Sequence, residues 1–166
     1  METKDQQDEI YGRFLQVCDI PRESVHVKPF TMVIFGGAGD LTRRKLLPSL
    51  FQLYTKKELP KDFSILVFDR LDMGFDEYCD MMQKSFETLR HEVPDEREWG
   101  RFLRHIHYFS GLFEEDTTYR RLGEEVKGTH SQGPEGERQI VYYMAVPPDA
   151  APLIVGKLKE HSLCKY

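Results

Sequence analysis

Apolar and polar residues follow one another in blocks along this chain, and the blocks predict alternating strands and helices. A continuous apolar run from Met32 to Phe35 is typical of a strand that is buried on both faces of a parallel sheet. Apolar residues then recur at intervals of three and four from Leu41 to Tyr54, which predicts an amphipathic helix. Because Pro48 lies inside this pattern, we expect a kink or a tightened turn there. The next apolar run, Phe63 to Phe68, completes a strand–helix–strand unit.

The rest of the chain repeats this order. Further helices are predicted over residues 75–89, 96–104, 117–126 and 150–161, and further strands over residues 106–109 and 140–146. Residues 128–138 contain three glycines and a proline with almost nothing apolar, so we expect an exposed loop. Residues 1–29 are polar and form a predicted leader, while residues 30–166 form one domain. We therefore predict an α/β fold with a doubly wound, mainly parallel sheet and helices on both faces.

Composition narrows the class of protein. Of the 166 residues, 31% are charged and 40% are hydrophobic, which is typical of a soluble globular domain. The formal net charge of −5 argues against a nucleic-acid partner. The acidic N-terminus does not resemble a signal peptide and no apolar run approaches membrane-spanning length, so we expect a cytoplasmic protein without membrane association. The three cysteines are widely separated and lack a CxxC pairing, which indicates neither a disulfide framework nor a metal site.

A glycine-rich segment, GGAGD, lies between the first predicted strand and the first predicted helix. Backbone amides at such a helix N-terminus, together with the helix dipole, attract a pyrophosphate. Gly36 and Gly37 would permit a tight turn, and Gly39 would let the helix approach strand and ligand closely. Asp40 could cap the helix, and Thr42 could add a hydroxyl near the phosphates. The alternative is a tight turn that binds nothing, which the flanking strand and helix make less favourable.

The end of the second predicted strand carries both an acid and a base, Asp69 and Arg70. An acid at this place bonds the ribose 2′-hydroxyl of NAD, and an arginine neutralises the 2′-phosphate of NADP. If Arg70 faces the ribose, NADP is favoured, because a guanidinium can grip a phosphate with two hydrogen bonds. Side chains alternate along a strand, so we expect only one of the two to face the ligand. A solvated arginine at a strand end is the alternative, and NAD stays possible.

The segment Phe35 to Pro48, FGGAGDLTRRKLLP, resembles the FGxxGDLxxxKLxP signature of the glucose-6-phosphate dehydrogenase family. Tyr108 to Gly111 (YFSG) and Tyr142 to Pro148 (YYMAVPP) are similar to the YVSG and YLAxPP segments of that family, in the same order. The similarity extends over about Phe30 to Cys164. It implies a Rossmann-like NADP-binding domain.

The resemblance also implies roles for individual residues. The glycine segment would hold the pyrophosphate, Arg70 the 2′-phosphate, and the backbone after the last strand would pass near the nicotinamide ribose. Lys45 would contact the sugar substrate, with an ordinary surface lysine as the alternative. The implied cofactor-binding residues are Gly36, Gly37, Ala38, Gly39, Asp40, Leu41, Thr42, Arg70, Ala145, Val146 and Pro147.

Two departures from the family pattern concern the cofactor. Ala38 stands where the family commonly has Ser or Thr, which removes one hydroxyl and should weaken cofactor binding modestly. Asp69 and Leu71 flank Arg70, where the family usually has a small residue and a hydroxyl-bearing one. The expected cofactor is NADP, with NAD as the alternative.

The third departure is the end of the sequence at Tyr166, before the family's EKPFG and RIDHYLGK segments. We therefore assign no catalytic residue, and we expect His105 and His107 to be surface or helix-end histidines. The resemblance implies the cofactor domain of an enzyme that, when complete, oxidises glucose 6-phosphate to 6-phosphogluconolactone in the pentose phosphate pathway. This chain alone would be inactive. The alternative is a non-catalytic regulatory or assembly protein that forms homo-oligomers or associates with a full-length dehydrogenase.

Overall fold

The computed structural model describes residues 27–90, 95–130 and 139–164, and within them it confirms the predicted α/β fold. The sheet has four strands in the order β3-β2-β1-β4, and every neighbouring pair is parallel. In register, Phe30 lies opposite Phe63 on one side and opposite Gln139 on the other. The strands are β1 (Phe30–Phe35), β2 (Phe63–Asp69), β3 (Ile106–Ser110) and β4 (Gln139–Met144).

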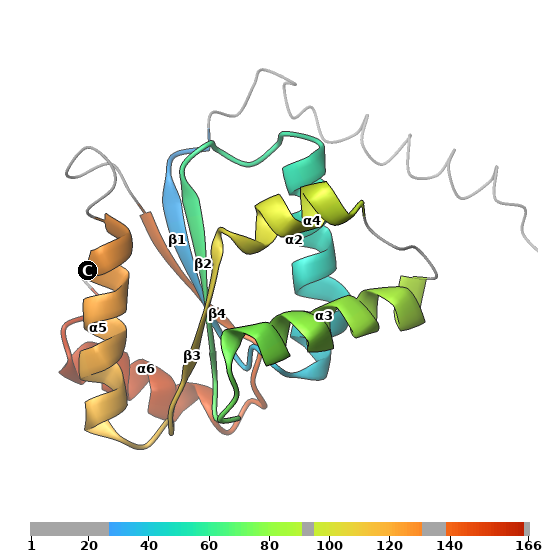
Figure 1. The fold of residues 1–166 in the computed structure, drawn as a ribbon. Helices are drawn as coiled ribbons and strands as arrows, with labels where there is room; N and C mark the ends of the chain where they lie inside the picture. The colour runs from blue at the N-terminus through green and yellow to red at the C-terminus, as the bar shows by residue number, and fades with distance from the viewer. Residues whose placement is uncertain (1–26, 91–94, 131–138, 165–166) are drawn as a thin grey trace, which may run out of the picture.

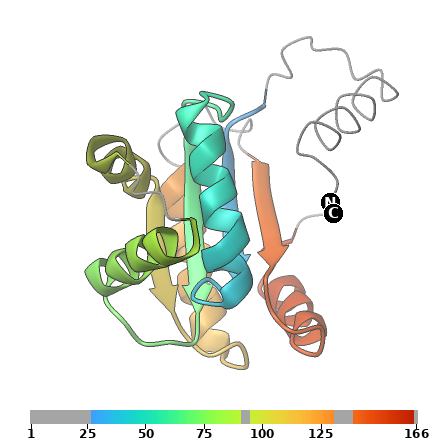
Figure 2. The ribbon, with the colours of Figure 1, turned by 90° about the vertical axis from the view of Figure 1, so that its right-hand side faces the viewer.

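Helices cover both faces of this sheet, as predicted for a doubly wound fold (Figure 1). One face carries α2, α3 and α4, and the other carries α5 and α6. Figure 2 looks onto the first of these faces, with α2 in front of the strands. The helices are α2 (Leu47–Thr55), α3 (Phe75–Arg90), α4 (Glu96–Leu103), α5 (Asp116–His130) and α6 (Ala151–Glu160), and a short π-helical segment, η1 (Thr42–Leu46), precedes α2.

The central strand β1 is buried on both faces, which explains its continuous apolar run. Val33, Ile34 and Phe35 have no exposed surface. Ile34 packs in the core beneath α2, α3 and α4, while Val33 and Phe35 pack beneath α5 and α6. Each core therefore receives alternate side chains of one strand, as the period of a strand requires.

Strand β4 is less buried than its composition suggests. Four of its six residues, Ile140 to Tyr143, are β-branched or aromatic, yet every residue of β4 is exposed or half-buried, and Val141 is 39% exposed. The reason is its place in the sheet, because β4 pairs only with β1 among the strands that the structure describes. An apolar strand thus lies at the edge of this part of the sheet.

The helical turn before Pro48 is wider than an α-helical turn, so the predicted tightened turn is wrong. The residues before this proline, Thr42–Leu46, form a π-helical segment, in which the amide of Leu47 donates to the carbonyl of Thr42. Proline has no N–H and its ring crowds the carbonyl four residues earlier, so the hydrogen bonding shifts by one residue and the turn widens. Pro48 itself is buried in the first turn of α2.

Two further predictions are corrected or left open. The predicted loop over 128–138 begins too early, because Gly128 and the two residues after it extend α5, and residues 131–138 lie outside the described part of the chain. The predicted leader, residues 1–29, also lies outside it except for its last three residues. No helix within the described ranges is long and apolar enough to cross a membrane.

Candidate functional site

The glycine segment forms a tight turn at the carboxyl end of β1. Gly36 has φ +85°, a value that L side chains rarely adopt. The amides of Gly36 and Gly37 both donate to the carbonyl of Phe68 in β2, at 2.9 and 3.0 Å. A Cβ atom at Gly36 would collide with the carbonyl of Ala145, and one at Gly37 would collide with the side chain of Val67. Gly36 therefore permits the turn, and Gly37 permits close packing on β2.

The helix after this turn begins at Asp40, which corrects two predictions. Gly39 accepts from the amide of Arg43 and so takes the capping position, while Asp40 already lies in the first turn. The carboxylate of Asp40 is exposed and approaches Arg44 at 3.5 Å instead of capping the helix. Thr42 is fully buried, and its hydroxyl donates to the carbonyl of Gly36 at 2.8 Å, so it braces the turn rather than facing a ligand.

Two exposed residues of the first turn have backbone amides that remain available as donors. Those of Asp40 and Leu41 make no hydrogen bond to any residue that the structure describes. Such amides lie at the positive end of the helix dipole, where an anion is bound favourably. By contrast, the amides of Ala38 and Gly39 are used within the protein, by Asp69 at 2.8 Å and by Gly36 at 3.1 Å. An anion at this site would meet the helix start rather than the whole glycine segment.

Asp69 and Arg70 point in different directions, as expected for successive residues at a strand end. Both carboxylate oxygens of Asp69 accept backbone amides, Oδ2 from Ala38 at 2.8 Å and Oδ1 from Leu71 at 3.2 Å. Arg70 is exposed, and its guanidinium carbon lies 5.5 Å from the ring centre of Phe113. The arginine therefore rests on an aromatic surface.

The segment Ala145 to Pro147 lies beside the glycine turn. The amide of Ala145 donates to the carbonyl of Phe35 at 2.8 Å, and its own carbonyl faces Gly36. Val146 is half-buried and Pro147 is exposed. Since β1 lies between β2 and β4, this is the point where the strand order reverses, and open α/β sheets bind ligands at the carboxyl ends of the strands there. The structure thus brings together two predicted segments that lie more than a hundred residues apart.

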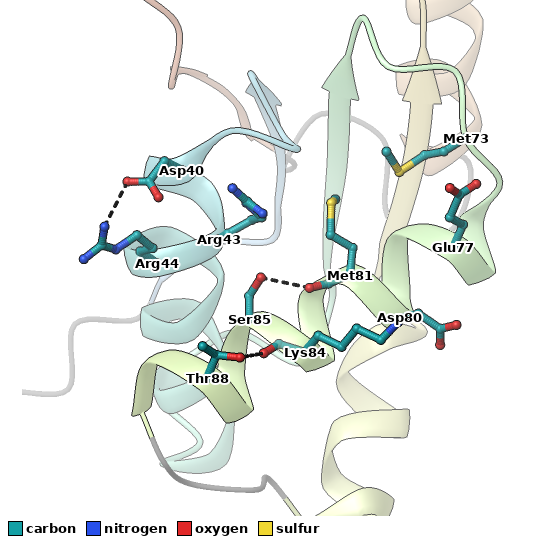
Figure 3. Close-up of a pocket in the computed structure, with 10 residues that line it drawn as sticks. All are labelled: Asp40, Arg43, Arg44, Met73, Glu77, Asp80, Met81, Lys84, Ser85 and Thr88. Atoms are coloured by element: carbon teal, nitrogen blue, oxygen red, sulfur yellow. Dashed lines mark hydrogen bonds and ion pairs between the residues drawn. The ribbon is translucent and has the colours of Figure 1, made fainter.

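A pocket of about 630 Å³ lies next to this site, between the first turns of the helix and α3 (Figure 3). Of the predicted site residues only Asp40 lines it. Its charges have both signs, and the buried Nε atom of Arg43 has no hydrogen-bond partner among the described residues. Lys45, the predicted substrate residue, is exposed on η1 and does not line this pocket. The lining residues are Asp40, Arg43, Arg44, Met73, Glu77, Asp80, Met81, Lys84, Ser85 and Thr88.

His105, His107 and His161 have packing or surface positions. The ring of His105 stacks on Phe63 at 4.2 Å, and its Nδ1 lies 3.1 Å from the carbonyl of the same residue. His105 is half-buried just after the end of α4, and His107 is exposed, which agrees with the predicted helix-end and surface positions. His161 pairs with Asp116 at 3.1 Å. None of these three side chains lies among the residues of the glycine turn.

Sequence reasoning missed Tyr78, which braces the glycine turn from α3. Its side chain is fully buried, and its hydroxyl donates to the carbonyl of Gly37 at 3.1 Å. Burial raises the pKa of Tyr78 well above its usual value, so the hydroxyl stays protonated and remains a donor. Nothing local marks this tyrosine, because it lies on the apolar face of a predicted helix like any core residue.

Comparison with known proteins now places this geometry in a family. Residues 33–166 match the family model described as "Glucose-6-phosphate dehydrogenase, NAD binding domain". The chain belongs to this family. The resemblance inferred from the sequence motifs is therefore confirmed, and the glycine turn is the start of a nicotinamide dinucleotide-binding domain of the glucose-6-phosphate dehydrogenase family.

Curated relatives and solved structures agree with the family match. The chain is 31% identical over 137 residues to the glucose-6-phosphate 1-dehydrogenase of Chlamydia muridarum, covering 81% of this chain and 27% of that protein. It is 30% identical over 139 residues to that of Emericella nidulans, covering 83% and 26%. A solved glucose-6-phosphate 1-dehydrogenase from Mycobacterium avium has the same fold, with a TM-score of 0.71 at 24% identity over 84% of this chain and 28% of that one. The chain spans about a quarter of the length of the curated relatives it matches.

Proposed function

We propose that this chain binds NADP as the cofactor domain of a glucose-6-phosphate 1-dehydrogenase. The observation that carries the proposal is the pair of available amides, on Asp40 and Leu41, at a helix N-terminus beside the reversal of strand order. Amides in this setting bind the pyrophosphate of a dinucleotide without any charged side chain. The tight turn at Gly36 and Gly37 supports this role, because only glycine fits there against the carbonyl of Ala145 and the side chain of Val67, and this close packing brings the helix start to the carboxyl end of β1.

Arg70 supports the choice of NADP over NAD. Its guanidinium is exposed while one face rests on Phe113, so its planar N–H groups stay available for a phosphate. A 2′-phosphate offers oxygens for two such bonds, whereas the 2′-hydroxyl of NAD offers no charge. The carboxylate of Asp69 could repel a phosphate, but it accepts hydrogen bonds from two backbone amides, whose dipoles offset part of its charge.

The remaining site residues would hold the nicotinamide half. Ala145, Val146 and Pro147 follow the strand beside β1, and their backbone would pass the nicotinamide ribose. When bound, the nicotinamide ring supplies a hydride acceptor, and the oxidation of glucose 6-phosphate would belong to the complete protein. Lys45, exposed on η1, would extend toward the phosphate of the sugar there.

Calorimetric titration of the chain with NADP and with NAD tests the cofactor proposal. Arg70→Ala should weaken NADP binding about tenfold or more, which corresponds to about 1.4 kcal/mol, and should change NAD binding little. Arg121→Ala is the matched control, because Arg121 also rests on a phenylalanine ring, that of Phe109, at 4.8 Å. The control should change neither affinity. Absence of binding by both dinucleotides would contradict the proposal.

A turnover assay tests the further expectation that this chain alone does not oxidise glucose 6-phosphate. With glucose 6-phosphate and NADP present, we expect no absorbance change at 340 nm above a blank without protein. Measurable turnover would show that catalytic groups are present among these 166 residues.

The exposed β4 edge favours a second role, association with another chain. On the side away from β1, β4 pairs with no strand that the structure describes, the side chain of Val141 is 39% exposed, and an open strand edge is a template for pairing. We propose a further copy or a full-length dehydrogenase as the partner. Size-exclusion chromatography with and without the full-length enzyme tests this, and a monomer in both cases would contradict it.

A further inference from the structure

Asp69 stands at the position that identifies the cofactor in many dinucleotide-binding folds, yet both of its carboxylate oxygens accept backbone amides. Oδ2 accepts the amide of Ala38 at 2.8 Å and Oδ1 accepts the amide of Leu71 at 3.2 Å. An acid that binds a ribose hydroxyl needs an oxygen directed at the ligand. Here the two hydrogen bonds direct both oxygens at the protein backbone.

The bond to Ala38 joins two distant segments. It spans 31 positions and connects the end of β2 to the middle of the glycine turn. Ala38 is 7% exposed, so its amide would otherwise be buried without an acceptor. Hydrogen bonds between a carboxylate and a backbone amide are among the stronger ones in proteins. The turn is thereby fixed in the form that leaves the amides of Asp40 and Leu41 available.

We propose that Asp69 is a positioning residue that holds the glycine turn in its binding form. It does not bind the ribose and does not distinguish NAD from NADP. This inference rests on the proposed function, since it concerns how the same site binds a dinucleotide. The carboxylate of Asp69 accepts the amide of Ala38, which a ligand anion could otherwise bind. The pyrophosphate would instead bind the amides of Asp40 and Leu41. The contribution of its hydrogen bonds to affinity is therefore equal for NAD and NADP.

The test compares two substitutions, Asp69→Asn and Asp69→Ala. Both remove the negative charge, and only asparagine keeps an oxygen that can accept the amide of Ala38. The difference between the two variants therefore isolates the hydrogen bond from the charge. Asp72→Ala is the matched control, because Asp72 is an exposed acid three residues away that does not contact the glycine turn.

The first measurement is hydrogen exchange at the amide of Ala38, followed by NMR without any cofactor. We expect exchange at least tenfold faster in Asp69→Ala than in Asp69→Asn, and no change in Asp72→Ala. The second measurement is calorimetric titration of both variants. Asp69→Ala should bind both NAD and NADP three- to tenfold more weakly than Asp69→Asn does. The ratio of NADP affinity to NAD affinity should stay constant within twofold.

Either of two results would overturn the proposal. Equal exchange of Ala38 in both Asp69 variants would show that the carboxylate does not hold the turn. A tenfold difference between Asp69→Asn and Asp69→Ala in the ratio of NADP affinity to NAD affinity would show that residue 69 binds the ribose and distinguishes the two cofactors. If the unaltered chain binds neither dinucleotide, the proposed function fails, and the exchange at Ala38 still decides the positioning role by itself.

Discussion

The hydroxyl of Tyr78 in α3 donates to the carbonyl of Gly37 in the glycine turn, 41 positions earlier, at 3.1 Å. The ring of Tyr78 stacks on that of Tyr108 at 4.7 Å. Gly37 also donates its amide to Phe68 of β2. One glycine is thus held by a strand through its N–H and by a helix through its carbonyl, which makes the turn part of the folded core.

Removal of this hydroxyl should destabilise the fold. Tyr78→Phe keeps the ring and leaves the Gly37 carbonyl unpaired, so we expect a loss of about 1–2 kcal/mol in the free energy of unfolding. Urea denaturation measures this loss. Tyr54→Phe is the control, because Tyr54 packs among aromatic rings on the same face while its hydroxyl has no hydrogen-bond partner among the described residues. An equal effect of both substitutions would contradict the bracing role of Tyr78.

A methyl group at Gly36 should be far more harmful than one on an exposed helix. Gly36→Ala combines a positive φ with a collision against the Ala145 carbonyl, so we expect a loss of at least about 2 kcal/mol in stability. Gly100→Ala in α4 adds a methyl group in open space and should stabilise the fold by about 0.5–1 kcal/mol. Thermal unfolding of both variants checks the contrast. Tolerance of alanine at Gly36 would mean that the turn has a different backbone conformation.

The carboxylate of Asp116 predicts a dependence of stability on pH. Hydrogen bonds from Lys157 and then His161 lower the pKa of Asp116 to about 2 in the folded chain, against about 3.9 in an unfolded one. Because the folded pKa is the lower one, its stabilising contribution is present above about pH 4 and is lost as the pH falls through about 2.

Urea unfolding of the chain and of Asp116→Asn, followed from pH 7 to pH 2, tests this dependence. The difference in free energy of unfolding should be present at neutral pH and should disappear toward pH 2. Glu124→Gln, an exposed acid of α5 without an ion pair to a described residue, is the control. A difference that grows on acidification would contradict the assignment.

The thiol of Cys79 should be unreactive at neutral pH. Burial, together with the charges of Asp76 and Asp80, raises the pKa of Cys79 to about 11. Only the thiolate reacts, so in a Cys18→Ser, Cys164→Ser background we expect alkylation at pH 8 to be about 100-fold slower than for an unhindered thiol. Unfolding in urea should restore the rate. Rapid alkylation of the folded chain would show that Cys79 is not protected.

Most of the fold could be predicted from hydrophobic periodicity, and the site only in outline. The runs at Met32 to Phe35 and at Phe63 to Phe68 mark buried strands because a strand covered on both faces is predominantly apolar. The half-exposed β4 has an equally apolar sequence, since composition records strand propensity and not position in the sheet. The π-helical turn before Pro48 was not predicted, because proline disrupts a helix in more than one way.

The orientation of polar side chains required the structure. Asp69 and Arg70 are adjacent, and the sequence alone could not say which faces the ligand. Asp69 bonds a residue 31 positions earlier and Tyr78 one that lies 41 positions earlier, so both contacts depend on tertiary packing. Asp40 illustrates the same limit, because a shift of one residue in the helix start turned a predicted cap into an exposed side chain.

Amide chemical-shift mapping during titration with NADP tests the central claim most directly, that the glycine turn and helix start of this chain bind a dinucleotide. The account predicts saturable shifts at Gly36 to Thr42, with the largest at Asp40 and Leu41, and smaller shifts at Arg70 and at Ala145 to Val146. The proline at 147 has no amide to report. No saturable shifts, or shifts confined to residues away from the carboxyl ends of β1, β2 and β4, would contradict it.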